Sequence, residues 1–233
     1  MKRRFNPAEL ELMDRAQPVS AELENDLENI RQLNRWFGSY ALISMFLSRW
    51  IKPGARLRIV DLATGSGDIP RLIGEYGRKV GAELRIDALD RQSATLEIAR
   101  KLSSRYPEIN FVQADLFHWQ SNECYDLVFC TLALHHFSGD DAVHVLRRCR
   151  ELSRKFILVS DLRRSLFGRI GVSFLTATLF REPMTKHDAR LSIARAFSFS
   201  EMNQLARRAG WTNFGHKTFP FARQALWFER GES

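Results

Sequence analysis

Apolar residues recur with a helical period along the first part of the chain. Between Asn25 and Ile51 they are three or four positions apart, which predicts an amphipathic helical segment with one apolar face. Its apolar positions include Leu27, Ile30, Leu33, Trp36 and Phe37. Pro53 and Gly54 end the segment. We therefore expect residues 1–56 to form a helical cap on a domain that spans residues 57–233.

From Leu57 onward, short apolar runs that predict strands alternate with amphipathic stretches that predict helices. The expected strands are the run from Ile59 into a glycine turn, Leu84 to Asp90, Ile109 to Phe117, Tyr125 to Phe137, and Lys155 to Asp161. The expected helices cover about Ile69 to Val80, Ser93 to Arg105 and Asp140 to Ser153. Such alternation is typical of a parallel sheet between two layers of helices.

Two segments complete the predicted domain. Phe197 to Gly210 should form a helix capped by Ser200, and Trp211 to Phe221 with Arg223 to Glu229 can form an antiparallel pair of strands. Residues 162–197 form an insertion whose first half, Ser165 to Phe180, is largely apolar. Because it follows a strand that ends at the edge expected to carry the active site, it predicts a lid; a packing helix fits the pattern equally well.

Composition and length restrict the class of protein. A chain of 233 residues makes one domain of ordinary size. Its three cysteines, Cys124, Cys130 and Cys149, form no CxxC pair, which favours a reducing compartment. We found no export signal and no run long enough to cross a bilayer, so we expect a cytoplasmic location.

The net charge of +8 raises the question of a nucleic-acid partner. The basic runs are Arg147 to Arg150 and the pair Arg163 and Arg164. No aromatic residues alternate with these charges as they do in a groove that binds a nucleic-acid strand, so a solvated surface is the favoured interpretation.

The segment IVDLATGSGDIP, Ile59 to Pro70, carries the clearest chemical signal. Gly65 and Gly67 let the backbone adopt a positive φ close to a ligand, and Asp68 can cap the helix that follows. A dinucleotide is disfavoured, because Pro70 replaces a small residue and Asp61 would repel a pyrophosphate. A ligand with a cationic amino acid end, such as S-adenosylmethionine, suits Asp61 better.

Polar side chains follow the next strands. Asp90 ends the second strand 23 residues beyond Gly67, where a ribose diol needs an acceptor, and Asp115 follows the third. The fourth strand leads to His135 and His136. We expect these strand ends to converge on one crevice.

These motifs resemble those of the class I S-adenosylmethionine-dependent methyltransferases. DLATGSG is similar to their glycine motif, ALD to the ribose motif, QAD to the adenine motif, and YDLVFCTLALHHF to the strand at the methyl-transfer face. Ala63 replaces the usual first glycine, which costs little if its φ is negative. The resemblance implies a Rossmann-like, doubly wound sheet of seven strands, mostly parallel with the last strand antiparallel. It also implies S-adenosylmethionine as the cofactor, bound by Asp61, Ala63, Gly65, Gly67, Asp90, Arg91, Asp115, Leu116 and Thr131.

Methyl transfer to a hydroxyl needs alignment and, for some acceptors, a base. We name His136 and Asp161 as the candidate catalytic residues, with His136 slightly favoured over His135. Adjacent residues of a strand point to opposite faces, so at most one histidine is expected to serve. Arg163 is a candidate contact for an anion.

The acceptor is expected to be small and lipophilic, such as a phenol, quinol or polyketide. The DLRRS and TKHD...AF segments are similar to a bacterial branch of methyltransferases from polyketide or phenolic-lipid pathways. Cys130 and Thr131 stand where metal-dependent enzymes have oxygen ligands, so no metal is expected. The Asn/Asp-Pro-Pro-aromatic motif of base-modifying enzymes is absent, although a nucleic-acid methyltransferase and a non-catalytic cofactor-binding protein stay as alternatives. A homodimer is left open.

Overall fold

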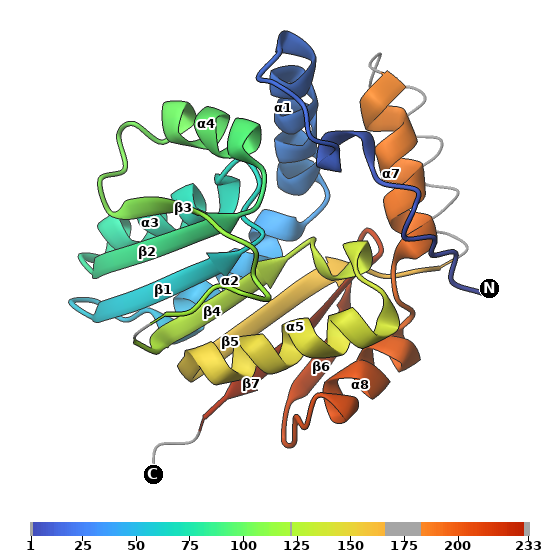
Figure 1. Cartoon of the computed structure of the whole chain (residues 1–233). Coiled ribbons are helices and arrows are strands. Elements are labelled where there is room, and N and C mark those ends of the chain that lie inside the picture. The colour runs from blue at the N-terminus through green and yellow to red at the C-terminus, as the bar shows by residue number, and fades with distance from the viewer. Residues whose placement is uncertain (1, 122, 166–182, 231–233) are drawn as a thin grey trace.

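The computed structural model describes residues 2–121, 123–165 and 183–230, and its centre is a sheet of seven strands in the order β3-β2-β1-β4-β5-β7-β6 (Figure 1). The strands are β1 (Arg56–Leu62), β2 (Glu83–Asp90), β3 (Ile109–Gln113), β4 (Tyr125–Thr131), β5 (Ser153–Leu162), β6 (Gly215–Phe219) and β7 (Arg223–Glu229). β1 to β5 are parallel, and β7 pairs antiparallel with both β5 and β6. The predicted fold class is confirmed.

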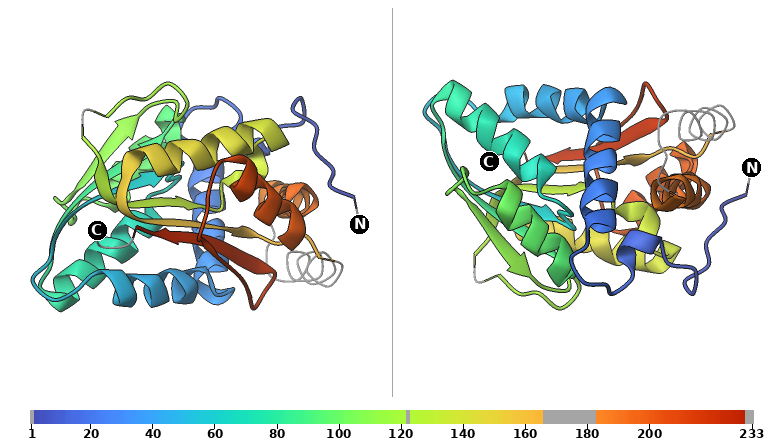
Figure 2. Two further views of the ribbon diagram at one scale, coloured as in Figure 1. Left: turned by 90° about the horizontal axis from the view of Figure 1, so that it is seen from below. Right: turned by 90° about the horizontal axis from the view of Figure 1, so that it is seen from above.

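Helices cover both faces of the sheet (Figure 2). The described helices are α1 (Ala21–Trp36), α2 (Ser39–Trp50), α3 (Asp68–Val80), α4 (Ser93–Leu102), α5 (Gly139–Leu152), α7 (Pro183–Arg195) and α8 (Phe199–Arg208), with the short 3₁₀ helices η1 (Leu12–Asp14) and η2 (Leu134–His136). Successive strand residues such as Ile59 and Val60 face opposite sides. One core packs α2 and α3 on the sheet, and the other packs α5 and α8.

Beyond the carboxyl ends of the parallel strands lie α1, α7 and the N-terminal segment (Figure 1). α1 packs Leu23 and Leu27 against Ala94 and Ile98 of α4. η1 and α1 both contact α7, which also contacts η2. Segments from the two ends of the chain therefore cover the edge where the strands end.

The N-terminal helical segment that the periodicity predicts consists of two helices. Gly38, with φ of 79°, separates α1 from α2, because this left-handed conformation cannot continue a helix. α2 packs on the sheet through Phe46 and Leu47, whereas α1 lies over its edge. The division of the chain at residue 57 stays a prediction.

Two further expectations about local structure are corrected. α8 is capped by Ser198 and not by Ser200, because Ser198 and Glu201 form a reciprocal capping box. The fourth strand ends at Thr131 and is followed by η2, so His135 and His136 lie in a 3₁₀ turn.

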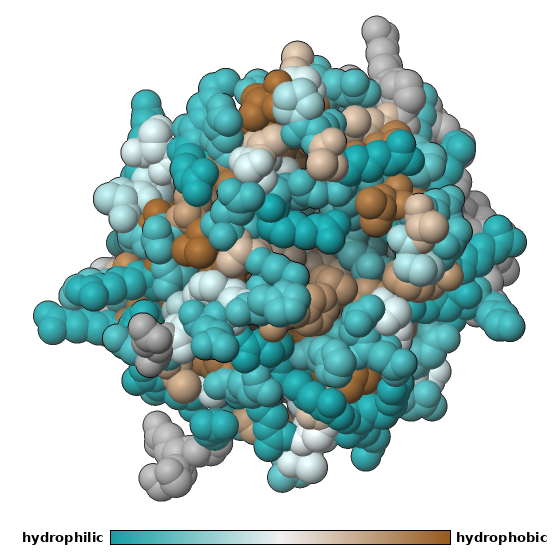
Figure 3. Space-filling model, in the orientation of Figure 1, coloured by the Kyte–Doolittle hydropathy of each residue, from teal (hydrophilic) through white to brown (hydrophobic). Residues whose placement is uncertain are grey.

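Of the proposed lid, residues 162–165 and 183–197 lie within the described residues. Phe174, Leu175 and Phe180, which support the prediction of a lid, fall outside them. Among the described helices, none is both long and apolar enough to cross a membrane. The face of the molecule in Figure 3 is largely hydrophilic, with apolar groups in separate small patches.

Candidate active site

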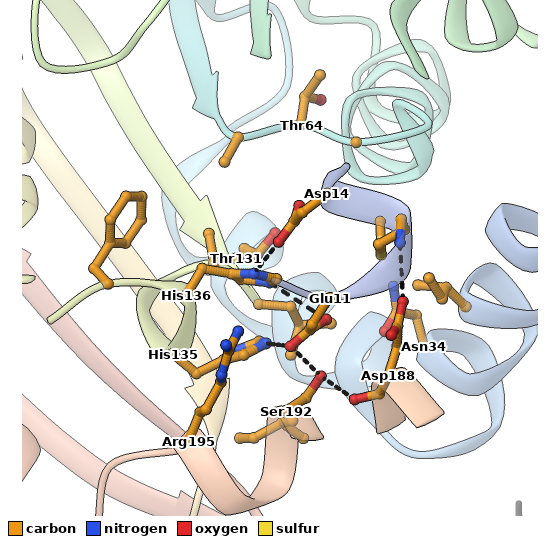
Figure 4. Close-up of a pocket in the computed structure, with 18 of the residues that line it drawn as sticks. Glu11, Asp14, Asn34, Thr64, Thr131, His135, His136, Asp188, Ser192 and Arg195 are labelled. Atoms are coloured by element: carbon orange, nitrogen blue, oxygen red, sulfur yellow. Dashed lines mark hydrogen bonds and ion pairs between the residues drawn. The ribbon is translucent and has the colours of Figure 1, made fainter. Parts of the chain in front are cut away.

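A cavity of about 920 Å³ lies at the carboxyl edge of the sheet. Two groups of residues line it, and Figure 4 shows part of both. The first group, which we call the strand-end half, consists of the turns after β1, β2 and β3. The second, the cap half, consists of the N-terminal segment, η2, and the described parts of α1 and α7. The two halves differ in how the sequence builds them.

The glycine turn after β1 is left-handed at three residues. Ala63, Gly65 and Gly67 have φ of 58°, 57° and 70°. The replacement of glycine by Ala63 would cost little only at a negative φ; at the observed positive φ its Cβ strains the turn by roughly 1–2 kcal/mol. At Gly67 a Cβ would lie 2.8 Å from the Phe111 ring, so this position needs glycine for space as well as for backbone conformation.

Asp68 does not cap α3 as predicted. Helix α3 starts at Asp68 itself, after Gly67, and its N-terminus has no side-chain cap. The Asp68 carboxylate instead accepts hydrogen bonds from Asn34 Nδ2 and Tyr40 Oη, both at 3.0 Å. Asp68 therefore ties α1 and α2 to the glycine turn.

Asp61, near the end of β1, is 1% exposed and, like Gly67, is not among the residues that line the cavity, although its neighbours Ala63, Thr64 and Gly65 are. Its Oδ2 accepts a 2.7 Å hydrogen bond from Thr64 Oγ1, while Oδ1 is buried without a partner among the described residues. Burial raises the pKa of Asp61 to about 8, and Asp68 and Asp90 act in the same direction against the Thr64 hydrogen bond. The site thus holds an acid with an unsatisfied oxygen.

Asp90 and Asp115 lie in the lining of the cavity, as predicted. The Asp90 carboxylate accepts hydrogen bonds from Gly65 N at 2.8 Å and Gln92 N at 3.0 Å, which connects the second strand to the glycine turn. Burial raises the pKa of Asp90. The Phe117 amide, which donates to Asp115, lowers the pKa of that carboxyl. The remaining predicted cofactor residues that line the cavity are Ala63, Gly65, Arg91, Leu116 and Thr131.

His135 and His136 point to the same side, contrary to expectation. Their ring centroids are 4.2 Å apart, because a 3₁₀ turn does not alternate side chains between faces as a strand does. His135 Nδ1 lies 2.6 Å from Asp161 Oδ1, and the His135 amide donates to Asp161 Oδ2. Asp161 is 1% exposed and is not part of the lining, so it holds His135 in place and does not face the cavity.

His136 lies between two carboxylates of the N-terminal segment. Its Nδ1 is 2.7 Å from Asp14 Oδ2, and its Nε2 is 3.9 Å from Glu11 Oε2. Burial alone would lower the pKa of His136, but the charges of Glu11 and Asp14 outweigh burial and raise it to about 10. Both imidazoles line the cavity, and the assignment of a catalytic role to His136 or Asp161 stays a prediction.

The N-terminal segment is the part of the site that the sequence did not reveal. The Asp188 carboxylate accepts the amides of Leu12 and Met13 at 2.8 and 3.0 Å, and Ser192 Oγ donates to Glu11 Oε1 at 2.8 Å. Arg3 donates hydrogen bonds to three backbone carbonyls. They belong to His135 of η2, to Phe137, which follows η2, and to Arg195 at the end of α7. The acidic stretch from Glu9 to Asp14 was visible, but nothing in it indicated that it would meet the two histidines.

Helix α1 contributes apolar side chains to the cavity, whereas the basic side chains of its lining come from other elements. Ile30, Leu33 and Phe37 line the cavity, whereas Trp36 is 53% exposed and does not. The basic lining residues are Arg91, Arg163, Arg195 and Arg223.

Comparison with known proteins shows which family part of the chain matches. Residues 59–155 match the family model described as a methyltransferase domain. The chain is 31% identical over 104 residues to the 2-phytyl-1,4-naphtoquinone methyltransferase of Thermosynechococcus vestitus, an alignment that covers 45% of the chain and 41% of that protein. It is 31% identical over 144 residues to the demethylmenaquinone methyltransferase of Thermotoga maritima, covering 56% of the chain and 59% of that protein.

Among solved structures, the plantazolicin methyltransferase in complex with SAH matches with a TM-score of 0.66 and 14% identity, covering 90% of the chain and 89% of that structure. The chain spans 41% and 59% of the length of the two curated relatives, so their activities are not carried over. Residues 59–155 are therefore a methyltransferase domain, and the chain has the fold of the class I S-adenosylmethionine-dependent methyltransferases.

Proposed function

We propose that this protein transfers a methyl group from S-adenosylmethionine to an oxygen or carbon atom of a small lipophilic acceptor, with a quinol or phenol as the favoured class. The observation that carries the proposal is the buried, unpaired Oδ1 of Asp61 beside a left-handed glycine turn. A buried polar atom without a partner costs about 1–3 kcal/mol, which a ligand that donates a hydrogen bond would recover.

The strand-end half fits the cofactor. Asp61 would hold its ammonium end, the Gly65 turn would lie against its carboxylate, and Asp90 would accept the ribose hydroxyls. Asp115 and Leu116, which line the cavity after β3, would contact the adenine. Bound there, the cofactor supplies an electrophilic methyl group on a sulfonium.

The cap half fits the acceptor. Ile30, Leu33 and Phe37 offer apolar contacts, and the N-terminal segment covers the site from water. His135 and His136 lie where an acceptor hydroxyl would be held, with His135 oriented by Asp161. Two of the relatives are named for methylation of naphthoquinone-type compounds, which supports a quinol.

Calorimetry with S-adenosylmethionine tests the cofactor assignment. Asp90→Ala should weaken binding by about 1–3 kcal/mol, because the ribose hydrogen bonds are lost. The matched control is Asp140→Ala, which removes an exposed carboxylate on α5 that pairs with Arg208. Tight NAD binding without S-adenosylmethionine binding would refute the assignment.

Mass spectrometry of a panel of acceptors tests the activity. A demethylated naphthoquinol, a simple phenol, and short RNA and DNA strands would be incubated with enzyme and cofactor. Methylation of the quinol or phenol alone is expected. Methylation of a nucleic acid, with binding that weakens as salt rises, would favour the rival class. Cofactor binding without transfer to any acceptor would indicate a non-catalytic protein.

A further inference from the structure

The two histidine rings of η2 turn the same atom toward one carboxylate. Nε2 of His135 lies 3.8 Å from Glu11 Oε1, and Nε2 of His136 lies 3.9 Å from Glu11 Oε2 (Figure 4). Within the part of the chain that the structure describes, these three residues form a group whose ligand-type atoms all lie within 4.8 Å of one another. Two imidazole nitrogens and one carboxylate converge there.

These distances are too long for direct hydrogen bonds, which for N–H···O lie at 2.7–3.2 Å. They are close to the spacing around a metal ion instead. Two ligands bonded to a tetrahedral Zn²⁺ at about 2.0–2.1 Å lie about 3.3 Å apart. A shift of about half an ångström in each side chain would therefore close the group around an ion.

Each histidine is oriented by a carboxylate on its opposite nitrogen. His135 Nδ1 is paired with Asp161 at 2.6 Å, and His136 Nδ1 with Asp14 at 2.7 Å. To bind a metal ion, each imidazole must be neutral, with its proton on Nδ1 and its lone pair on Nε2, so the ion would displace the second proton from His136. This carboxylate–histidine arrangement is the usual support for a metal-binding imidazole.

The third ligand is also positioned. Ser192 Oγ donates to Glu11 Oε1 at 2.8 Å, and Glu11 is 2% exposed. If both imidazoles are neutral, their Nε2 lone pairs face a buried carboxylate, which is an unfavourable contact. A positive charge in this space, carried by a metal ion or by a proton on His136, would remove that repulsion.

We propose that Glu11, His135 and His136 bind a divalent transition-metal ion of the Zn²⁺ class. Nitrogen ligands disfavour Mg²⁺ and Ca²⁺, which prefer oxygen, whereas two histidines and one carboxylate suit Zn²⁺ or Fe²⁺. All three residues line the cavity, so an ion that they held would be accessible from it. This inference departs from our sequence-based expectation of no metal, which considered only residues at the end of the fourth strand.

The test uses the full chain treated with a chelator and then titrated with ZnCl₂ alone, with bound metal measured by equilibrium dialysis and elemental analysis. One zinc ion per chain is expected. Glu11→Gln keeps the size of the side chain and should weaken zinc binding at least ~10-fold, and His136→Ala should weaken it further. Asp14→Asn, which changes only the support of His136, should weaken binding by about 10–100-fold.

The matched control is His144→Ala, an exposed histidine on α5, which should leave zinc binding unchanged. Binding of Co²⁺ gives a second readout, because a four-coordinate site produces strong visible absorption that Glu11→Gln should abolish. Calorimetry with S-adenosylmethionine on the same variants separates loss of the metal ligand from loss of the fold, and needs no acceptor.

Several outcomes would overturn the proposal. These are no zinc bound by the wild type, zinc bound equally by Glu11→Gln and His136→Ala, or Mg²⁺ bound as well as Zn²⁺. Loss of zinc in His144→Ala would also overturn it, since binding would then be at the surface. In those cases the positive charge between the three side chains would be that of a protonated His136, which Glu11 and Asp14 stabilise. Neither result changes whether the strand-end half binds S-adenosylmethionine.

Discussion

The strand-end half and the cap half of the cavity are built in different ways. In the strand-end half, the contacts join residues that follow neighbouring strands. The Gly65 amide donates to Asp90 because β1 and β2 are parallel neighbours and end side by side. In the cap half, residues more than a hundred positions apart meet, such as Asp14 with His136 and Glu11 with Ser192. A rigid edge of the sheet thus faces a covering assembled from the ends of the chain.

This difference predicts a division of labour between the two halves. Substitutions in the strand-end half should change cofactor binding and stability together, because its carboxylates and glycines also hold the backbone. Substitutions in the cap half should change turnover and acceptor binding while leaving cofactor binding nearly unchanged.

The largest effect is expected for His136→Ala in the cap half. It removes an imidazole that lines the cavity at the end of β4, so kcat should fall by about 100-fold or more, the range typical of a positioned catalytic group. Cofactor affinity should change little. Steady-state kinetics and calorimetry on the same preparation measure the two effects, with His144→Ala as the control. A parallel loss of turnover and cofactor affinity would contradict the division between halves.

The next effect is expected at the two ends of α3. Gly67→Ala and Gly81→Ala both place a Cβ on a left-handed residue, with φ of 70° and 68°. Gly81→Ala should cost roughly 1–2 kcal/mol of unfolding free energy from backbone strain alone. Gly67→Ala should cost about 1–3 kcal/mol more, because its Cβ meets the Phe111 ring at 2.8 Å, whereas nothing lies within 4 Å of Gly81.

Urea unfolding of both variants measures this difference. S-adenosylmethionine binding should weaken for Gly67→Ala and persist for Gly81→Ala. Equal losses of stability would show that Phe111 moves away at little cost, and that the strand-end half is less rigid than its contacts indicate.

A smaller effect is expected from the pH dependence of cofactor binding. Because the pKa of Asp61 is raised to about 8, the carboxyl is mostly protonated at pH 7 in the free protein. A cationic ligand favours the ionised form, so binding at pH 7 should release most of one proton, and affinity should rise as pH rises toward 8. Above pH 8 the gain should stop.

Calorimetry in two buffers with different ionisation enthalpies counts the released protons. Asp61→Asn should remove the release, while Asp115→Asn should not, because the pKa of Asp115 is lowered and that carboxyl is already ionised. Proton release that survives Asp61→Asn would assign it to another group and remove the main electrostatic support for the cofactor site.

The same contrast explains which parts of the molecule the sequence predicted. The sheet, Gly65, Asp90 and Asp115 were predicted because strand periodicity and short motifs are local signals. The acidic residues Glu11 and Asp14 have no local signal that connects them to η2, since their contacts form only when the whole chain has folded.

Other differences came from signals that were present but were given too little weight. Gly38 interrupts a helical pattern that otherwise continues to Ile51, and the Ser198 to Glu201 spacing is that of a capping box. The two histidines were assigned to a strand because the apolar run before them is continuous. The catalytic roles of His136 and Asp161 and the lid at Phe174 and Leu175 stay predictions.

The paired hydrogen bonds from Leu12 and Met13 to the Asp188 carboxylate have a kinetic consequence. Both amides depend on one side chain in a different segment, so they lose protection whenever the N-terminal segment separates from α7, even while the sheet stays folded. Their hydrogen exchange rates therefore measure how often the N-terminal segment separates from α7. These two backbone protons allow the motion of one wall of the cavity to be followed separately from the unfolding of the sheet.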